Sequence, residues 1–401
     1  MTGISIETTL ELWASSLRAV KSADGAIVYP GAGGGFCGLV PGRTTRRRAA
    51  PRPAGCVRKR RAIPVPGASR PFWVEDGGTL TRCATSSREY ALETLADQDA
   101  VLVLDETGFL KQGKACCGVA RQYTGSAGKI TNCQIGVFCA YVSRHGDAFI
   151  DRALYLPKAW TDDPIRMTAT HVPNGIAFAT KPALAVKMIS HALAVNVPFS
   201  WVAADSVYGV GDIEMALRHA GKGYVLGVSA NRHFGSWRGK PPVAGAAEEI
   251  AQGLASSAWH RLSAGEGTKG ARLDDWAYCE LADLDAAEYD EERSGLWTRG
   301  LLIRRNIADG DFAFFSTWCP VGTGIETLVM IEGHRWAIED SFETAKNELG
   351  LDHNETRSWH GWHRHVSLVM LAFAMMAAIR HRANSTTPKK KKRGIKGPPS
   401  S

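Results

Sequence analysis

The sequence predicts an α/β fold in which helices flank a central sheet. Short apolar runs alternate with helix-like segments from residue 88 to residue 228, a pattern typical of strands packed between helices. Two of these runs are followed directly by an aspartate, Asp105 and Asp205. Hydrophobic residues make up 44% of the 401 residues and charged residues 22%. The chain can therefore bury a core, which excludes a coiled coil, a collagen-like fibre and a mainly disordered protein.

The first 87 residues fall into two parts. Residues 1–21 favour a short amphipathic helix, because apolar residues such as Trp13 and Leu17 recur at helical spacing. Residues 22–87 contain eleven Gly and seven Pro and show no sustained period, which predicts an irregular or disordered segment. This segment holds ten Arg and one Lys against three acidic residues, a net charge of +8.

The segment 88–228 is expected to form the first part of the fold. It opens with a helix-like stretch, and VLVL at 101–104 predicts a short buried strand that ends at Asp105. Further strands are expected at 118–125, 130–143, 148–157, 199–204 and 223–228, and helices at 181–195 and 212–219. The second aspartate, Asp205, directly follows one of these strands.

The rest of the chain divides into three parts. Residues 229–326 carry scattered tryptophans among short strand-like runs and predict a mostly β insertion. Residues 327–382 are expected to be helical, and residues 383–401 form a basic, Pro-containing tail that predicts disorder. The longest apolar run, 367–379, is too short to span a bilayer. A buried core helix is therefore favoured over a membrane segment.

Charge placement and cysteine content narrow the class of partner and the compartment. Residues 380–401 carry +8 with no acidic residue and residues 1–21 are neutral, so a total of +8 leaves −8 on residues 88–379. A basic flank on an acidic body suits a polyanionic partner, with the body holding cations. The nine cysteines form no C-x-x-C pair, which favours reduced thiols in the cytoplasm and argues against structural zinc.

The two aspartates are candidates for one site. In open α/β sheets, ligands bind outside the carboxyl ends of the strands. Asp105 and Asp205 would therefore converge if their strands were neighbours. The alternative is that each aspartate is an ordinary turn residue after a strand, which is common.

A third acidic residue lies on a patterned helix near the C-terminus. At 3.6 residues per turn, Arg335, Glu339 and Lys346 fall on one narrow stripe. An apolar stripe borders the charged one and consists of Ile338, Phe342, Ala345 and Leu349. Such a helix would pack on a sheet and present its charged groups along the seam. A solvated face with helix-spaced ion pairs is the alternative.

These residues resemble motifs of the DDE transposases of bacterial insertion sequences. One large branch of that family has the signature Y-x-x-R-x-x-x-E-x-x-x-x-x-x-K, which Arg335, Glu339 and Lys346 match in type and spacing, whereas Glu332 stands at the tyrosine position. DETGFLKQGKACCGVARQYTG from Asp105 and VAADSVYG around Asp205 are similar to the two aspartate motifs of one subfamily. ELGLDHNETRSWHGWHRH is similar to that subfamily as well. The resemblance runs from about residue 88 to residue 382, and the branch carries a β insertion before its glutamate.

The resemblance implies a ribonuclease H-like mixed sheet and a DNA transposase. Such an enzyme cleaves the ends of its element and transfers the freed strand into target DNA. Asp105, Asp205 and Glu339 would be the catalytic residues and would hold Mg²⁺, for which Mn²⁺ can substitute. Oxygen ligands suit Mg²⁺, and a pair of such ions can activate water and stabilise the leaving oxygen. Arg335 and Lys346 would bind DNA phosphates beside them.

The resemblance also implies the partners and the compartment. The partner is double-stranded DNA, both element ends and target, and a homodimer on DNA is expected. The protein would be cytoplasmic and associated with the bacterial nucleoid, and no membrane is implied. The other interpretation is a transposition-defective relic, or a noncatalytic DNA-binding remnant of such a transposase.

Weaker features keep two interpretations each. Trp336 could stack on an unpaired DNA base or pack in the core. His360, His363 and His365 favour helix packing or phosphate contacts over a zinc site. The composition of residues 22–87 is what a GC-rich gene gives when it is read in the wrong frame, so this segment is either a frameshift product or a basic DNA-binding arm.

Overall fold

The computed structural model describes residues 78–235, 244–267, 270–281 and 297–386. The helix expected at 1–21, most of the irregular segment that follows it, and the basic tail from residue 387 lie outside these residues.

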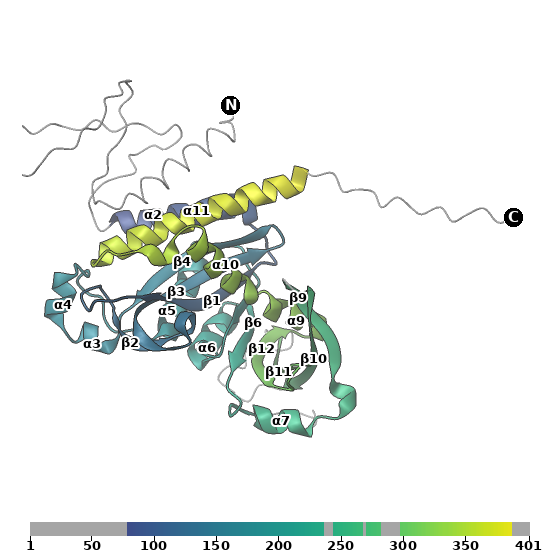
Figure 1. The fold of residues 1–401 in the computed structure, drawn as a ribbon. Helices are drawn as coiled ribbons and strands as arrows, with labels where there is room; N and C mark the ends of the chain where they lie inside the picture. Colours follow the sequence, from purple (N-terminus) through teal and green to yellow (C-terminus); the bar gives the residue numbers. More distant parts are fainter. Residues whose placement is uncertain (1–77, 236–243, 268–269, 282–296, 387–401) are drawn as a thin grey trace, which may run out of the picture. The chain divides into compact units, whose positions relative to one another are not determined.

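Ten strands of the described residues form one mixed sheet (Figure 1). Its order is β2-β3-β1-β5-β6-β12-β11-β10-β9, with β4 paired to β3. Neighbours β1, β5 and β6 are parallel, whereas the other pairs are antiparallel. The strands are β1 (Val101–Leu110), β2 (Ala120–Thr124), β3 (Lys129–Ser143), β4 (Gly146–Tyr155), β5 (Trp201–Ala204), β6 (Gly223–Val228), β9 (His260–Gly267), β10 (Gly270–Leu281), β11 (Trp297–Arg305) and β12 (Phe312–Pro320). The predicted α/β class is confirmed, and the sheet is consistent with a ribonuclease H-like fold.

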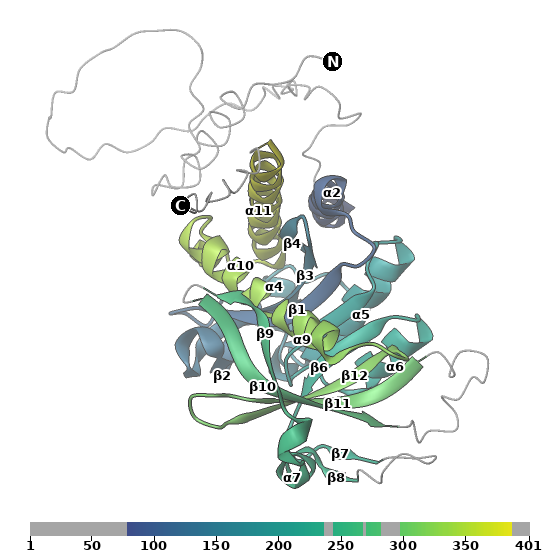
Figure 2. The same ribbon diagram turned by 90° about the vertical axis from the view of Figure 1, so that its right-hand side faces the viewer.

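Helices cover both faces of the sheet, as Figures 1 and 2 show. Helices α2 (Gly78–Leu95), α10 (Trp336–Asn347) and α11 (Trp359–Thr386) lie on one face, and α5 (Lys181–Ala194) and α6 (Gly211–His219) lie on the other. The apolar stripe of α10 is buried as predicted, and the ring of Phe342 packs on Phe138 of β3 with 5.2 Å between centroids. The shorter elements are α3 (Lys158–Thr161), α4 (Pro164–Ala169), α7 (Ala247–Gly253), α9 (Ile325–Gly333), β7 (His233–Phe234) and β8 (Gly245–Ala246).

Strand β1 is longer than the sequence predicted. The apolar run 101–104 indicated a strand that ends at Asp105, but β1 continues to Leu110 because β3 pairs with it as far as Leu110 and Cys133. Strand β5, on its other side, pairs only up to Leu104 and Ala204. Asp105 therefore lies in the middle of β1, at the point where its parallel neighbour ends.

Helix α2 begins inside the segment that was predicted to be irregular up to residue 87. The prediction was wrong for its last ten residues, because the helix starts at Gly78. Residues 79–95 contain neither Gly nor Pro, so the helix at 88–95 can extend toward the N-terminus without a breaker.

The β-rich segment at 229–326 extends the central sheet. Strand β12 pairs with β6 and is followed outward by β11, β10 and β9. An apolar cluster under these strands includes Phe234, Ile250, Leu301 and Phe314. The division of the chain into domains remains a prediction.

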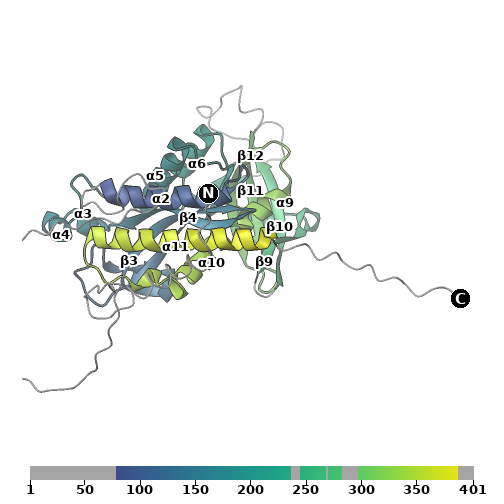
Figure 3. The ribbon, with the colours of Figure 1, turned by 90° about the horizontal axis from the view of Figure 1, so that it is seen from above.

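Helix α11 contains the longest apolar run and lies alongside α2 in Figure 3. Among the described residues it is the one helix long and apolar enough to cross a membrane, by length and composition only. Its inner side is part of the core: Phe373 packs on Phe149 of β4 with 5.2 Å between ring centroids, and Ser367 accepts a 2.8 Å hydrogen bond from Arg152. These contacts are those of a core helix, as the sequence predicted.

Candidate active site

Asp105 lies on β1, and Asp205 directly follows the neighbouring parallel strand β5. Leu104 and Ala204 are register partners, so the two aspartates directly follow paired residues of β1 and β5. Burial, and after it the nearby charge of Asp205, raises the pKa of Asp105 to about 8. The pKa of Asp205 is also raised, chiefly by burial. The structure thus assembles the acidic pair that the sequence predicted.

The turn after β5 is held close to β6 by two residues without side chains. A Cβ on Gly209 would lie 1.8 Å from the backbone oxygen of Gly227, and a Cβ on Gly227 would lie 2.7 Å from the nitrogen of Ser206. Asp205 itself accepts a 3.0 Å hydrogen bond from the backbone of Val207. The direction of this carboxylate is therefore set by a tightly packed turn.

Glu339 approaches the pair from helix α10. Its charge contributes to the raised pKa of Asp105. Its carboxylate accepts a hydrogen bond from the guanidinium of Arg335, one turn earlier. Burial works against the charge of Arg335, but Glu332 and Glu339 outweigh it and leave the pKa of Arg335 above its ordinary value.

Lys346 reaches the same region from the C-terminal end of α10. Its ammonium donates hydrogen bonds to Thr107 Oγ1 at 2.6 Å and to Ser126 Oγ at 2.8 Å. Thr107 lies two residues after Asp105, and Ser126 lies in the turn between β2 and β3. Burial lowers the pKa of Lys346. The three predicted stripe residues, Arg335, Glu339 and Lys346, thus line the seam between α10 and the sheet.

Trp336 is only partly buried, so the core-packing interpretation describes it incompletely. Arg335 lies over its ring at 5.0 Å from the centroid, and Arg272 of β10 lies at 4.8 Å. Arg272 in turn approaches Asp340 at 3.9 Å. The ring is thus bounded by two guanidinium groups beside the carboxylates.

Sequence reasoning missed a second charged cluster behind the aspartates. Glu106 follows Asp105, and its carboxylate accepts hydrogen bonds from Lys181 at 2.5 Å and from Tyr208 at 2.5 Å. Successive residues of a strand point to opposite faces, so Glu106 faces the α5 side of the sheet. Its place next to Asp105 and the tyrosine in VAADSVYG were the available signals, whereas nothing in the sequence pointed to Lys181.

The glutamate at the tyrosine position of the signature is a buried partner of Arg335. Glu332 has 1% of its side chain exposed and lies 3.5 Å from Arg335 and 3.9 Å from Arg304. Burial raises the pKa of Glu332, and the two arginines offset this rise only in part. The departure from the signature thus places a second carboxylate against the same guanidinium.

The donor chemistry of the three predicted residues suits a hard divalent cation. All three are carboxylates, two of them with pKa values raised by burial, and a cation would offset their repulsion. Within the described parts of the chain, no three His, Cys, Asp or Glu side chains stand ready at metal-binding positions. To bind a metal, Glu339 would have to give up its hydrogen bond with Arg335.

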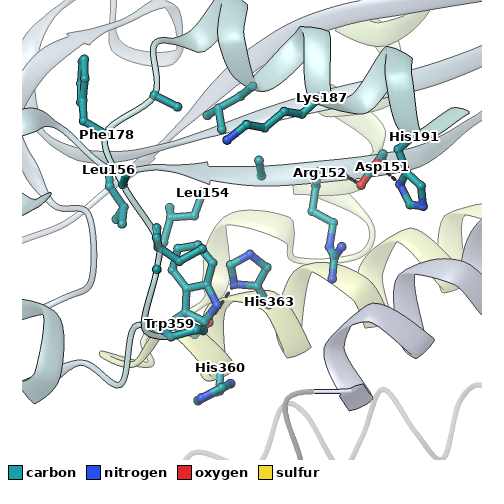
Figure 4. A pocket seen from close by; sticks show the side chains of 17 residues that line it. Asp151, Arg152, Leu154, Leu156, Phe178, Lys187, His191, Trp359, His360 and His363 are labelled. Carbon is teal, nitrogen blue, oxygen red and sulfur yellow. Dashed lines mark hydrogen bonds and ion pairs between the residues drawn. The ribbon is translucent and has the colours of Figure 1, made fainter. Parts of the chain in front are cut away.

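The histidines near the start of α11 are engaged in packing. His363 is buried and bonds the Trp359 carbonyl at 2.9 Å, and His365 bonds the Gly350 carbonyl at 3.0 Å. His360 and His363 help to line a pocket between β4, α5 and α11 (Figure 4), where His191 bonds Asp151 at 3.1 Å. None of the three predicted carboxylates lines this pocket.

Two family models and one relative match the chain. Residues 80–255 match the model described as "DDE superfamily endonuclease", and residues 181–375 match the model described as "Transposase DDE domain". Over 136 residues the chain is 31% identical to the "Probable transposase for insertion sequence element IS701" of Microchaete diplosiphon. That alignment covers 32% of this chain and 31% of the relative, so the chain matches about a third of the relative's length.

Proposed function

The chain belongs to the DDE-type transposases of insertion sequences, and we propose that it cleaves the ends of its element and joins the freed strand to target DNA. The observation that supports this activity is that Asp105 on β1 and Asp205 just after the adjacent parallel strand β5 lie together, with Glu339 of α10 beside them. We further propose that these three residues are catalytic and hold Mg²⁺, with Mn²⁺ as a substitute.

The protein residues have separable tasks in this proposal. Bound Mg²⁺ would supply Lewis acidity toward the scissile phosphate and toward the attacking water. Asp105 and Asp205 would supply the fixed part of the ligand set, because each side chain also accepts a backbone hydrogen bond, from Glu106 at 2.7 Å and from Val207 at 3.0 Å. Glu339, whose side chain is 40% exposed, would be the ligand that turns toward the site when DNA arrives.

The basic residues of α10 would bind and orient DNA. A phosphate that drew the guanidinium of Arg335 away would free Glu339 for the metal, since the two groups now pair. Lys346, held by Thr107 and Ser126, would present its ammonium to the phosphate backbone near the cut. Trp336, next to Arg335, would contact DNA at the same seam. The partner is double-stranded DNA, and we expect a homodimer on paired ends.

The proposal is tested by strand cleavage with the full chain. The substrate is a duplex that carries the terminal sequence flanking the gene, and the reaction is followed with Mg²⁺, with Mn²⁺ and with EDTA. Asp105→Asn, Asp205→Asn and Glu339→Gln should each lower cleavage by at least a thousandfold. Glu343→Gln is the matched control, because Glu343 is exposed on the same helix. This variant should cleave the duplex normally.

The same assay distinguishes an active transposase from a transposition-defective relic or a noncatalytic remnant. A protein that binds the duplex but does not cleave it with either metal would be a noncatalytic remnant. Near-normal cleavage by any of the three carboxylate variants would remove that residue from the proposed site.

A further inference from the structure

The hairpin formed by β2 and β3 presents an apolar pair to solvent beside the candidate active site. Tyr123 and Ile130 are direct cross-strand partners, so both side chains project from the same face of the hairpin. Tyr123 is 61% exposed and Ile130 is 60% exposed. A paired aromatic and aliphatic residue at this exposure is a surface suited to contact another molecule.

The opposite face of the hairpin fixes it to the protein. Thr124 is buried against Gly108 of β1, whose missing Cβ would lie 2.0 Å from Thr124 Oγ1. In the turn, Ser126 Oγ lies 3.2 Å from Thr107 Oγ1 and accepts the hydrogen bond from Lys346. Tyr123 therefore lies three residues from a group that touches the candidate DNA-binding lysine. The hairpin is an anchored extension of the site.

The charge around this apolar pair is positive. Residues 107–146 contain five Lys and Arg and no Asp or Glu, although residues 88–379 as a whole carry −8. Arg121 is exposed two residues before Tyr123, so it projects from the same face, whereas Lys129, the cross-strand partner of Thr124, is exposed on the other face. An aromatic surface flanked by a guanidinium group is complementary to a nucleic-acid strand.

We infer that the outer face of the β2–β3 hairpin is a DNA-contact surface, on which Tyr123 stacks against a base exposed next to the cleaved bond. This inference rests on the proposed function and adds a contact that the carboxylate motif does not contain. Ile130 would support the stacked base from the neighbouring strand, and Arg121 would hold the adjoining phosphate. The class of ligand is DNA that is unpaired or frayed beside the cut.

The probe is a duplex that carries the element end, with 2-aminopurine at one position at a time around the expected cut. Fluorescence is read in EDTA, so no cleavage is required. The wild-type chain should change the fluorescence at one or two adjacent positions. Tyr123→Ala should abolish that change, whereas Tyr123→Trp should keep it because the ring is retained. Ile130→Ser tests the supporting residue on β3. Its matched control is Ile165→Ser, because Ile165 is 82% exposed on α4.

Cleavage with Mg²⁺ is the second readout. Loss of one stacked base should reduce cleavage of the paired duplex roughly 5- to 100-fold in Tyr123→Ala, and a mismatch at the cut should restore most of it. Equal fluorescence and equal cleavage in Tyr123→Ala and wild type would overturn the inference while leaving the proposed function intact. Absence of wild-type cleavage with a Tyr123-dependent fluorescence change would overturn the proposed function alone.

Gel filtration at several protein concentrations tests whether a second copy of the chain binds this surface instead of DNA. Strand β2 lies at the edge of the sheet, and an edge strand can pair with a second copy of the chain. Should Tyr123→Ala and Ile130→Ser change the oligomeric state without changing the DNA signals, the surface would be a protein interface and the inference would be wrong.

Discussion

The guanidinium of Arg335 bonds the carboxylate of Glu339 one turn later in α10, and it does so while lying 3.5 Å from the buried Glu332. Arg335 thus stands between a buried carboxylate and a proposed metal ligand. If a DNA phosphate draws Arg335 away, Glu332 loses this partner and keeps only the more distant Arg304, which lies 3.9 Å from it. The state of the site is therefore coupled to a buried ion pair.

Removal of Arg335 should destabilise the protein through Glu332. Arg335→Gln leaves a carboxylate with 1% exposure almost unpaired, which should cost about 3–5 kcal/mol in the free energy of unfolding. Adding Glu332→Gln should recover most of that loss, as measured by urea unfolding. Arg261→Gln is the control, because Arg261 is 59% exposed and its partner Asp275 keeps Arg305; it should cost under about 1 kcal/mol. A loss that Glu332→Gln does not recover would contradict the coupling.

Asp105 should make the stability of the metal-free protein fall as pH rises. Its pKa is about 8 in the folded chain and about 3.9 in an unfolded one. Between these values the folded state holds a proton that the unfolded state has lost, so stability decreases from pH 4 to pH 8. Asp105→Asn should flatten this slope and raise the melting temperature at pH 8 in EDTA. An unchanged slope in the variant would count against the raised pKa.

Mg²⁺ should reverse the destabilisation at high pH. A cation that binds the ionised carboxylates stabilises the folded state, so the wild-type melting temperature should rise with Mg²⁺ more at pH 8 than at pH 6. Asp105→Asn and Asp205→Asn should lose the response, and Glu343→Gln should keep it. Differential scanning fluorimetry over a Mg²⁺ titration measures the effect, and an equal response in all variants would place the ion elsewhere.

Lys181 should stabilise the protein by holding Glu106. Lys181→Met leaves the partly buried Glu106 with Tyr208 alone and adds unbalanced negative charge beside Asp205, which should cost about 1–3 kcal/mol. Lys181→Arg should keep most of the stability. Lys187→Met changes an exposed lysine on the same helix and should be close to neutral in urea unfolding. Similar losses for Lys181→Met and Lys187→Met would show that helix composition, not the contact, is responsible.

Gly108 should be required for the hairpin to reach the site. Gly108→Ala would place a methyl group 2.0 Å from Thr124 Oγ1, so the hairpin must move and Ser126 would separate from Lys346. Cleavage and stability should both fall, and Thr124→Gly in the same chain should restore part of each. Gly113→Ala lies in open space after β1 and is the control. Normal activity of Gly108→Ala would show that the hairpin position is unimportant.

Much of the local structure could be predicted from the chain. The helices at 181–195 and 212–219 and the strands at 130–143 and 223–228 lie where the apolar periods indicated. The error at β1 has a different origin. Its residues after Leu104 are held in the strand by β3, a pairing that no local pattern contains.

The candidate site shows the same division. The stripe of Arg335, Glu339 and Lys346 follows from helix geometry and was predicted, but the partner of each side chain was not. Lys346 bonds Ser126, 220 positions away, and Lys181 bonds Glu106, 75 positions away. That the three carboxylates are catalytic stays a prediction.

The sequence alone therefore determined the α/β class, the order of its main elements and the face of α10 that carries charge, because strand and helix periods are set by backbone geometry within a few residues. The tertiary structure alone decided that Asp105 lies mid-strand, that Arg335 neutralises Glu339, and that the β2–β3 hairpin is tied to Lys346. These facts depend on strand order and on contacts between distant segments. Packing and hydrogen bonding select such contacts only when the whole chain is folded.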